Sequence, residues 1–409
     1  MTTVVHPGDS LSGRQRLSYI LVLGALTALG PFTIDTYLPA MPRLESDFDV
    51  PTTVIQLTLT ATTIGFGFGQ LIVGPWSDKV GRRLPLLLAT TVHIIACVAA
   101  ALAPNVELLG AARALQGIGA AAGGVVAMAM VRDLFGGRPL VRMLSRLALV
   151  NGLAPVLAPV LGSQLLLLMP WRGIFWVLAV YGAFVLGCVA LWIVETLPKA
   201  RRRDAGHSTM RQRYRALFTD RVYVGVIVVG AMNFSGLFAY LSASSFVFQQ
   251  VYHFDPQQFG ILFAVNSVGI IIGVQTSARI TKYVGPQWIL AVSTAVMLAS
   301  AAAIVILTEA GVGMWGVVIP LWVFICGAGF GFPCVQVLAL NGHAHEAGTA
   351  ASLMGALNFG LAGLLSPIVG LLGVASAAPM GIVMVGCSVV SVCALWVVVR
   401  PKTVPELVH

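Results

Sequence analysis

The sequence predicts an all-α membrane protein with twelve transmembrane helices in two six-helix bundles. Of the 409 residues, 58% are apolar and 10% are charged, whereas soluble domains carry about 25% charged residues. A helix needs about 20 apolar residues to cross a bilayer, and twelve stretches of roughly that length occur. One long basic segment follows the sixth stretch and divides the twelve equally. This composition excludes both a soluble fold and a disordered chain.

Each predicted span is a long apolar stretch with few charged residues. In order, the spans cover 17–39, 52–74, 84–103, 107–131, 143–168, 173–195, 222–247, 259–279, 286–307, 312–338, 348–371 and 377–399. Strands of a membrane barrel are only about ten residues long. Backbone groups in hydrocarbon also need partners within their own segment or barrel. We therefore predict a helix for every span.

Basic residues set the predicted orientation and the domain boundaries. All but three of the 24 Lys and Arg residues fall in segments on one side of the bilayer, the exceptions being Arg43, Arg113 and Arg172. The positive-inside rule places that side, with both termini, in the cytoplasm. The predicted parts are a cytoplasmic N-tail (1–16), an N-terminal bundle (17–195), a basic cytoplasmic linker (196–221), a C-terminal bundle (222–399) and a cytoplasmic C-tail (400–409).

The same features limit the possible partners and activities. The net charge of +9 is explained by topology, so we predict a lipid bilayer and no nucleic acid as partner. The six cysteines lie in apolar runs without metal-ligand spacing, which predicts no metal site and no cofactor. Metalloprotease, nucleophile-elbow and P-loop motifs are absent, which argues against an enzyme or an ATP-driven pump. A non-transporting scaffold stays open as an alternative. We expect a monomer.

Two charged residues lie within predicted spans rather than at their ends, Asp35 in the outer part of span 1 and Arg113 in span 4. Each costs about 2.5–3.5 kcal/mol near a helix centre, so such residues usually face a cavity and serve a function. Burial disfavours an ionised carboxylate and a nearby cation favours it. The pair therefore predicts a proton-coupling site, and a static ion pair is the structural alternative.

Two further groups of residues are candidates for function. Asp78 sits at the cytoplasmic end of span 2, one turn before Arg82 and Arg83. It could pair with a helix N-terminus or with a cation of another loop, the opposing residues at the end of span 4 being Arg132 and Asp133, or it could form a solvated turn. Kinked and polar positions within spans are candidate pocket residues, with helix packing as the alternative. The predicted substrate-binding residues are Tyr37, Asn151, Pro155, Asn233, Phe234, Tyr240, Asn266 and Asn358.

Several motifs resemble the major facilitator superfamily. Gly74-Pro-Trp-Ser-Asp78-Lys-Val-Gly81-Arg82-Arg83 is similar to the signature loop between spans 2 and 3 of that family. Arg113-Ala-Leu-Gln116-Gly117 resembles the span 4 motif of proton-coupled members, and Ala154–Gly162 resembles the span 5 motif of antiporters. The segments Asp35–Pro42 and His345–Ser352 further resemble Bcr/CflA-type drug-resistance exporters.

This resemblance implies a drug–proton antiporter of the bacterial cytoplasmic (inner) membrane that works by alternating access. Asp35 would be the proton-linked acid and Arg113 its coupling partner. The conformational gate would consist of Gly74, Asp78, Gly81, Arg82, Arg83 and Asp133. Ala154 and Ala158 stand where the general antiporter motif prefers glycine, although Ala-Pro is usual in the Bcr/CflA subfamily.

The embedded charges indicate the class of substrate. A single embedded acid and a single embedded arginine favour neutral or zwitterionic drugs, phenicol- or bicyclomycin-like, over dications. The proton gradient would drive export without any cofactor. The alternative is an exporter of the same fold that carries a metabolite such as a sugar or nucleoside.

Overall fold

The computed structural model describes residues 8, 12–198, 210–341 and 347–404. Within this part, all regular secondary structure is helical, and twelve helical segments are long and apolar enough to span a membrane. The predicted fold class and the predicted twelve spans are therefore confirmed for the described chain. His345 and Glu346 of the predicted subfamily motif, and residues 199–209 of the predicted linker, lie outside the described residues.

The helices follow the predicted order along the chain. The first half contains α1 (Gly13–Asp35), α2 (Met41–Phe48), α3 (Thr52–Val80), α4 (Arg83–Ala101), α5 (Val106–Leu134), α6 (Gly137–Leu168) and α7 (Trp171–Trp192). The second half contains α8 (Met210–Thr219), α9 (Arg221–Phe246), α10 (Pro256–Ile280), α11 (Pro286–Glu309), α12 (Trp315–Leu340), α13 (Ala347–Leu365), α14 (Pro367–Leu372) and α15 (Ala378–Cys393). Short π-helical turns extend α9 over Val247–Val251 and α15 over Ala394–Val399.

Two predicted spans are divided in the structure. Helix α1 continues through Pro31 and ends at Asp35, and a short 3-10 helix at Leu38–Ala40 connects it to α2. The eleventh span is interrupted at Ser366, where Pro367 begins α14. Proline has no backbone N–H and fixes φ, so it fits the first turn of a new helix.

Contacts divide the chain into two units. The first comprises Met1–Tyr37 and Ala61–His207, and the second comprises Leu38–Thr60 and Ser208–His409. Helix α3 therefore contributes to both units. Hydrogen bonds hold the early segment in the second unit: Ser245 Oγ donates to the Leu38 carbonyl (2.6 Å), and Gln56 Nε2 donates to the Ser242 carbonyl (3.2 Å).

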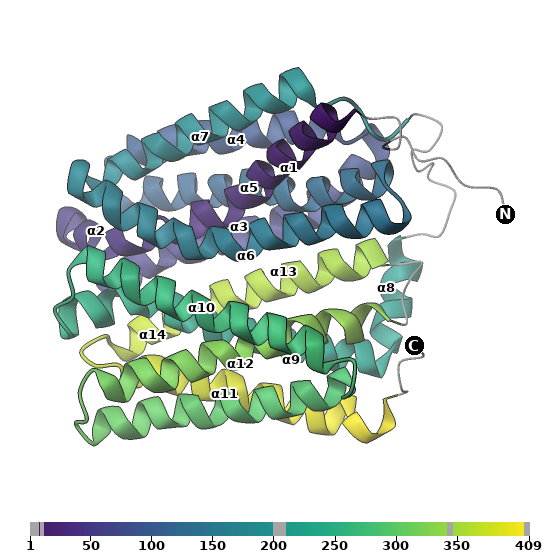
Figure 1. Ribbon diagram of the computed structural model, residues 1–409. Coiled ribbons are helices and arrows are strands. Elements are labelled where there is room, and N and C mark those ends of the chain that lie inside the picture. Colours follow the sequence, from purple (N-terminus) through teal and green to yellow (C-terminus); the bar gives the residue numbers. More distant parts are fainter. Residues whose placement is uncertain (1–7, 9–11, 199–209, 342–346, 405–409) are drawn as a thin grey trace. The chain divides into compact units, whose positions relative to one another are not determined.

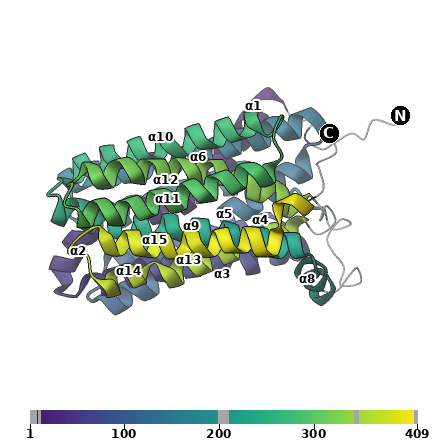
Figure 2. The same cartoon turned by 90° about the horizontal axis from the view of Figure 1, so that it is seen from below.

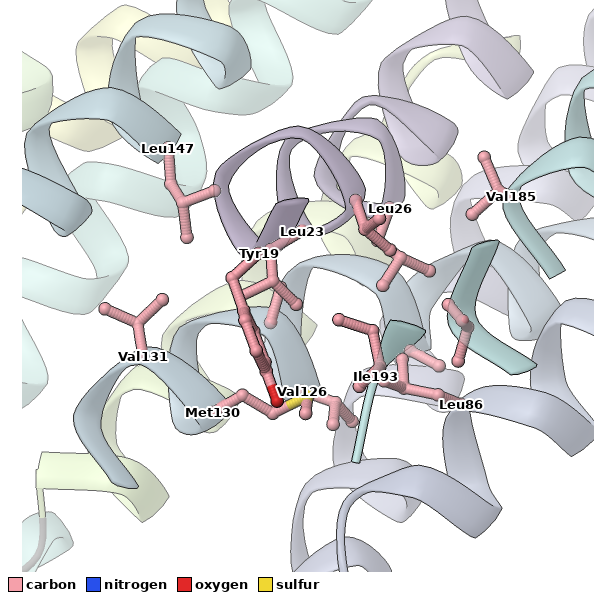
Figure 3. Close-up of a cluster of buried hydrophobic side chains, with 14 of the residues drawn as sticks. Tyr19, Leu23, Leu26, Leu86, Val126, Met130, Val131, Leu147, Val185 and Ile193 are labelled. Atoms are coloured by element: carbon pink, nitrogen blue, oxygen red, sulfur yellow. The ribbon is translucent and has the colours of Figure 1, made fainter. Parts of the chain in front are cut away.

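In the first unit, α1 lies beside α5 and α7 beside α4 (Figure 1). Their apolar side chains form one core, in which Leu23 and Leu26 of α1 meet Val126 and Met130 of α5 (Figure 3). Leu23, Leu26 and Val126 are fully buried. This core fixes α5 against its neighbours, and α5 carries the buried arginine described below.

In the second unit, α10, α12 and α11 lie side by side, and α15 lies against α9 (Figure 2). The core of this unit includes Tyr223 of α9, Leu290 of α11 and Leu395 after α15, all fully buried. The Tyr223 hydroxyl donates a hydrogen bond to the Ala350 carbonyl of α13 (2.9 Å). Helix α9 is thereby joined to α13 by a buried polar contact as well as by packing.

Candidate functional site

Arg113 is held inside the first unit without exposure to solvent. Its Nη1 donates to the carbonyl of Thr33 (2.8 Å) and to Oε1 of Gln116 (2.8 Å). The guanidinium carbon lies 4.4 Å from the ring centroid of Tyr37 and 5.7 Å from that of Phe175. A cation over an aromatic face is attracted by the ring quadrupole. The predicted embedded cation is thus stabilised by a backbone carbonyl, an amide and two rings.

Part of the Arg113 guanidinium remains available for another group. Both Nε and Nη2 are buried and have no hydrogen-bond partner within the described chain. Leaving a charged donor buried and unpaired is costly. Arginine presents its donors in a planar fork that matches a carboxylate. The site therefore has donors that an acceptor can use in another state of the protein.

Helix α5 can hold Arg113 at this depth because its glycines permit backbone-to-backbone packing. A Cβ on Gly117 would lie 2.1 Å from the carbonyl oxygen of Thr62, and one on Gly123 would lie 2.1 Å from that of Leu26. On a third side, a Cβ on Gly119 would lie 2.6 Å from the backbone nitrogen of His93. Small residues at such positions let membrane helices approach closely. The glycines after Arg113 are thus explained by contacts with α3, α4 and α1.

Asp35 is buried at the end of α1, with 6% of its surface exposed. It lies two residues after Thr33, whose carbonyl binds Arg113. The ion pairs found within the described chain do not include one between Asp35 and Arg113. The structure therefore places the two predicted coupling residues in the same unit but does not join their charged groups.

The remaining candidates of the first unit differ in exposure. Tyr37 is fully buried and packs on Arg113 and on Phe175, with a ring-centroid distance of 5.7 Å to Phe175. On α6, Asn151 is exposed and Pro155 is half-buried. Tyr37 therefore supports the arginine site, whereas the two α6 residues lie nearer the surface of this unit.

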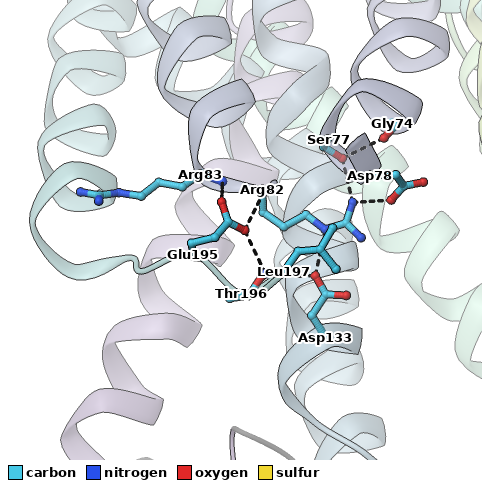
Figure 4. Close-up of polar contacts among 9 residues, drawn as sticks. All are labelled: Gly74, Ser77, Asp78, Arg82, Arg83, Asp133, Glu195, Thr196 and Leu197. Carbon is cyan, nitrogen blue, oxygen red and sulfur yellow. Dashed lines mark hydrogen bonds and ion pairs between the residues drawn. The ribbon is translucent and has the colours of Figure 1, made fainter. Parts of the chain in front are cut away.

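The predicted gate residues form a charged cluster at the α3–α4 connection (Figure 4). Arg82 Nη1 binds Asp78 (2.5 Å) and Arg82 Nε binds Asp133 at the end of α5 (2.8 Å). Ser77 Oγ accepts a further bond from Nη1 (2.8 Å) and donates to the carbonyl of Gly74 (2.8 Å). Burial alone would lower the pKa of Arg82, but the Asp133 and Asp78 carboxylates hold that pKa above its ordinary value.

The backbone around the charged cluster explains the other gate residues. Helix α3 ends at Val80, and Gly81 has φ +106°, a left-handed conformation that glycine adopts at little cost. Arg83 begins α4, and its Nη2 donates to the carbonyl of Ala190 in the last turn of α7 (2.7 Å). Arg83 therefore joins α4 to α7 and has no ion pair among those found in the described chain.

Glu195 is the main residue of this cluster that sequence reasoning missed. Its carboxylate accepts the backbone N–H groups of Arg82 (2.8 Å), Arg83 (3.2 Å) and Leu197 (2.9 Å). An anion at a helix N-terminus satisfies unpaired donors and interacts favourably with the helix dipole. The sequence places Glu195 only at the end of the sixth predicted span, just before the basic linker. Its one visible signal is an acid at the end of an apolar span.

Polar candidates of the second unit divide into two kinds. Asn233 is 2% exposed, and its Oδ1 accepts a hydrogen bond from Ser391 Oγ of α15 (2.7 Å). Asn266 Nδ2 of α10 donates to the hydroxyl of Tyr240 on α9 (3.1 Å), and Tyr240 stacks on Phe263 with centroids 5.6 Å apart. The Oδ1 of Asn266 is buried without a partner in the described chain. Both asparagines therefore join two helices, and Asn266 in addition has an open acceptor.

An aromatic cluster surrounds the candidate Phe234. Its ring centroid lies 5.0 Å from that of Phe238, 4.9 Å from Phe359 of α13 and 6.4 Å from Phe332 of α12. Asn358, next to Phe359, is half-buried, and its Oδ1 has no partner in the described chain. Rings beside a few unpaired polar atoms are typical of small-molecule pockets.

Comparison with known proteins decides the family. The sequence model of the family described as the Major Facilitator Superfamily matches residues 21–367 of this chain. The chain belongs to the major facilitator superfamily. This superfamily consists of transporters, so the protein is a multi-pass membrane transporter and not an enzyme.

Relatives of this superfamily member extend over nearly its whole length. It is 35% identical over 387 residues to an uncharacterized MFS-type transporter, YdgK of Bacillus subtilis, covering 94% of this chain and 96% of that protein. It is 30% identical over 378 residues to a bicyclomycin resistance protein homolog of Haemophilus influenzae, covering 92% and 95%. Among solved structures, a D-xylose–proton symporter has a TM-score of 0.77 at 13% identity, covering 96% and 100%. That last likeness shows the shared fold alone.

Proposed function

We propose that this transporter exports small, mostly neutral or zwitterionic drugs, bicyclomycin- or phenicol-like, in exchange for protons by alternating access. The observation that carries the proposal is the buried pair of charged residues in the first unit. Asp35 is buried and belongs to none of the ion pairs found in the described chain. Two donor atoms of Arg113 have no hydrogen-bond partner there. The bicyclomycin resistance protein homolog supports the substrate class.

Proton exchange follows from the chemistry of these two residues. A protonated Asp35 is neutral and costs little to bury, whereas its ionised form needs a cation or water. The free Nε and Nη2 of Arg113 can supply charge-assisted hydrogen bonds to that carboxylate. Proton release from Asp35 would then accompany its pairing with Arg113. Drug binding and proton release would be linked if the drug favours the state that forms the pair.

The charged cluster of Asp78, Arg82 and Asp133 would act as the conformational gate. Its bonds lie within the first unit, where they fix the loop between α3 and α4. Three further residues shape the same loop. Gly74 accepts a hydrogen bond from the Ser77 hydroxyl, Gly81 makes a left-handed turn, and Arg83 donates a hydrogen bond to α7. A fixed loop would present the Asp78 carboxylate, which is 33% exposed, to another part of the transporter in one state of the cycle.

The second unit would supply most of the drug-binding surface. Phe234 and its neighbouring rings offer an apolar wall, and Asn266 and Asn358 each offer an unpaired amide oxygen. A sugar or nucleoside would need several hydrogen-bonding groups, and it is the alternative substrate class. The rings around Phe234 favour drugs over these metabolites.

The proposed function also includes a membrane location, an oligomeric state and an energy source. The bicyclomycin relative and the YdgK relative both come from bacteria, so we place the transporter in the bacterial cytoplasmic membrane with both termini in the cytoplasm. It would function as a monomer, without a cofactor and without nucleic acid. The proton gradient would be its only energy source.

Purified protein in liposomes with an imposed pH gradient tests the function. Bicyclomycin or chloramphenicol should trigger proton movement in the wild type and in Glu107→Gln, which alters an exposed acid on α5. Asp35→Asn should be silent while its melting temperature is retained. Equal signals in Asp35→Asn and the wild type would remove Asp35 from the mechanism. Silence in all three folded proteins would reject drug antiport, and sugars and nucleosides would then be assayed.

A further inference from the structure

A second polar group contacts Arg113 through the side chain of Gln116. His93 and Cys97 of α4 are both fully buried and face α5. Cys97 Sγ lies 3.0 Å from Nε2 of Gln116 and 3.4 Å from Nε2 of His93. His93 Nδ1 lies 3.3 Å from the main-chain oxygen of Gln116. The proposed transport mechanism leaves both α4 side chains without a role.

One assignment of hydrogens satisfies every contact in this group. Gln116 Nε2–H donates to Cys97 Sγ, and the Cys97 S–H donates to Nε2 of His93. A neutral imidazole that carries its proton on Nδ1 then donates to the Gln116 carbonyl. The chain of bonds therefore begins at the side chain of Gln116 and ends at its backbone. Each member uses a donor and an acceptor that its chemistry provides.

This closed chain fixes the orientation of the Gln116 amide. Oε1 must point to Arg113, whose Nη1 it accepts at 2.8 Å, because Nε2 is directed to the sulfur. The reversed amide would direct N–H groups at a guanidinium, which has no acceptor. Buried polar networks of this kind are rigid when fully satisfied.

We propose that His93 and Cys97 are positioning residues for Arg113, acting through Gln116. They hold the amide so that Nη1 of Arg113 stays bound, and Nε and Nη2 are thereby presented to the proton-linked acid. The inference rests on the proposed proton antiport, because it assigns these residues to the proton step. Drug binding itself would not depend on them.

Close helix packing supports a role beyond filling space. Gly119 brings the α5 backbone against the backbone of His93, so α4 and α5 cannot separate at this level without losing that contact. A leucine or alanine would fill the same apolar surroundings without a desolvated imidazole and thiol. Polar side chains inside a membrane are expensive and mark functional sites.

Substitutions at Cys97 test the proposal in proteoliposomes, with bicyclomycin as the probe. Cys97→Ala removes the S–H donor and the sulfur acceptor, whereas Cys97→Ser keeps a donor and an acceptor in the smaller hydroxyl group. We expect kcat for drug-driven proton movement to fall about tenfold in Cys97→Ala, as for leaving a buried polar group without its partner, with KM little changed. Cys97→Ser should restore most of the rate. Cys188→Ala, at a buried α7 cysteine outside the network, is the control.

An infrared measurement tests the network without any substrate. The S–H stretching band of Cys97, isolated by subtracting the spectrum of Cys97→Ala, shifts when the thiol loses its acceptor. We expect a shift in His93→Phe and in Arg113→Met, because the second variant releases the Gln116 amide. An unchanged band in Arg113→Met, or wild-type rates in Cys97→Ala, would overturn the proposal. If wild-type protein ignores bicyclomycin, the proposed function fails, and the infrared result alone decides whether the network reaches Arg113.

Discussion

Glu195 accepts the backbone N–H of Arg82 at 2.8 Å, although 113 residues separate the two in sequence. The next residue, Thr196, donates its hydroxyl to Asp133 Oδ2 (3.2 Å), the same oxygen that binds Arg82. The segment leaving α7 thus contacts both the backbone and the ion pair of the charged cluster (Figure 4). That segment is the covalent route by which the chain runs from the charged cluster into the predicted linker.

Replacing Glu195 tests these contacts. Glu195→Gln loses the charge at the start of α4 and places an amide N–H against a backbone N–H. We expect it to reduce stability by about 1–3 kcal/mol, the range for a charged hydrogen-bond partner, and to slow transport. Thermal unfolding of detergent-purified protein measures the first effect. Glu107→Gln, at the exposed first turn of α5, should lose no more than about 1 kcal/mol. Equal losses in the two variants would contradict the contacts described for Glu195.

Arg82 should not tolerate lysine. Its guanidinium binds Asp78 and Asp133 through different nitrogens, which a single ammonium cannot reproduce in that geometry. We expect Arg82→Lys to lower the transport rate about tenfold or more, as for loss of one charged hydrogen bond. The rate of drug-driven proton movement in liposomes is the measurement. Lys79→Ala, at an exposed position of α3, should retain the wild-type rate.

Two adjacent glycines of α5 should respond in opposite ways to alanine. A Cβ on Gly123 would meet the Leu26 carbonyl at 2.1 Å, whereas one on Gly124 has nothing within 4 Å. We expect Gly123→Ala to cost about 1–3 kcal/mol through overpacking. Gly124→Ala should be neutral or stabilising, because alanine favours a helix by up to about 1 kcal/mol over glycine. Melting temperatures compare the two variants directly, and similar losses would contradict the packing of α5 on α1.

The two buried asparagines of α9 and α10 should separate stability from drug affinity. Asn233→Leu breaks the bond to Ser391 and should mainly lower the melting temperature, with about 1–3 kcal/mol lost for an unpaired buried group. Asn266→Leu loses the bond to Tyr240 and also removes the amide oxygen that has no partner in the described chain, so beside any loss of stability it should raise KM for the drug. Transport kinetics beside melting curves distinguish these outcomes. A raised KM only in Asn233→Leu would reverse the two assignments.

Sequence predicted the helices better than it predicted their contacts. Twelve spans follow from apolar length alone, because the bilayer fixes that length. Asp35 and Arg113 stand out because charge is rare at such depth. The Arg82 bonds to Asp78 and Asp133 were anticipated in part, since the resemblance grouped the three residues.

Other features depend on tertiary contacts that no local pattern encodes. In sequence Glu195 is only the last residue of a predicted span, because its partners lie at the start of α4. Asn233 and Asn266 are both single asparagines in apolar helices, and only the opposite helix shows that one bonds to Ser391 and the other to Tyr240. His93 reads as a packed histidine until Cys97 and Gln116 are placed beside it.

The three close glycine contacts of α5 limit how the transporter can change under drug selection. At Gly117, Gly119 and Gly123 any larger residue would collide with the backbone of a neighbouring helix, which cannot move aside as a side chain can. Isolates selected for resistance to new compounds should therefore keep all three. Adaptive substitutions should accumulate instead around Phe234 and Phe359, where ring size can change without shifting a backbone. The helix that carries Arg113 would stay constant while the proposed drug-binding surface diversifies.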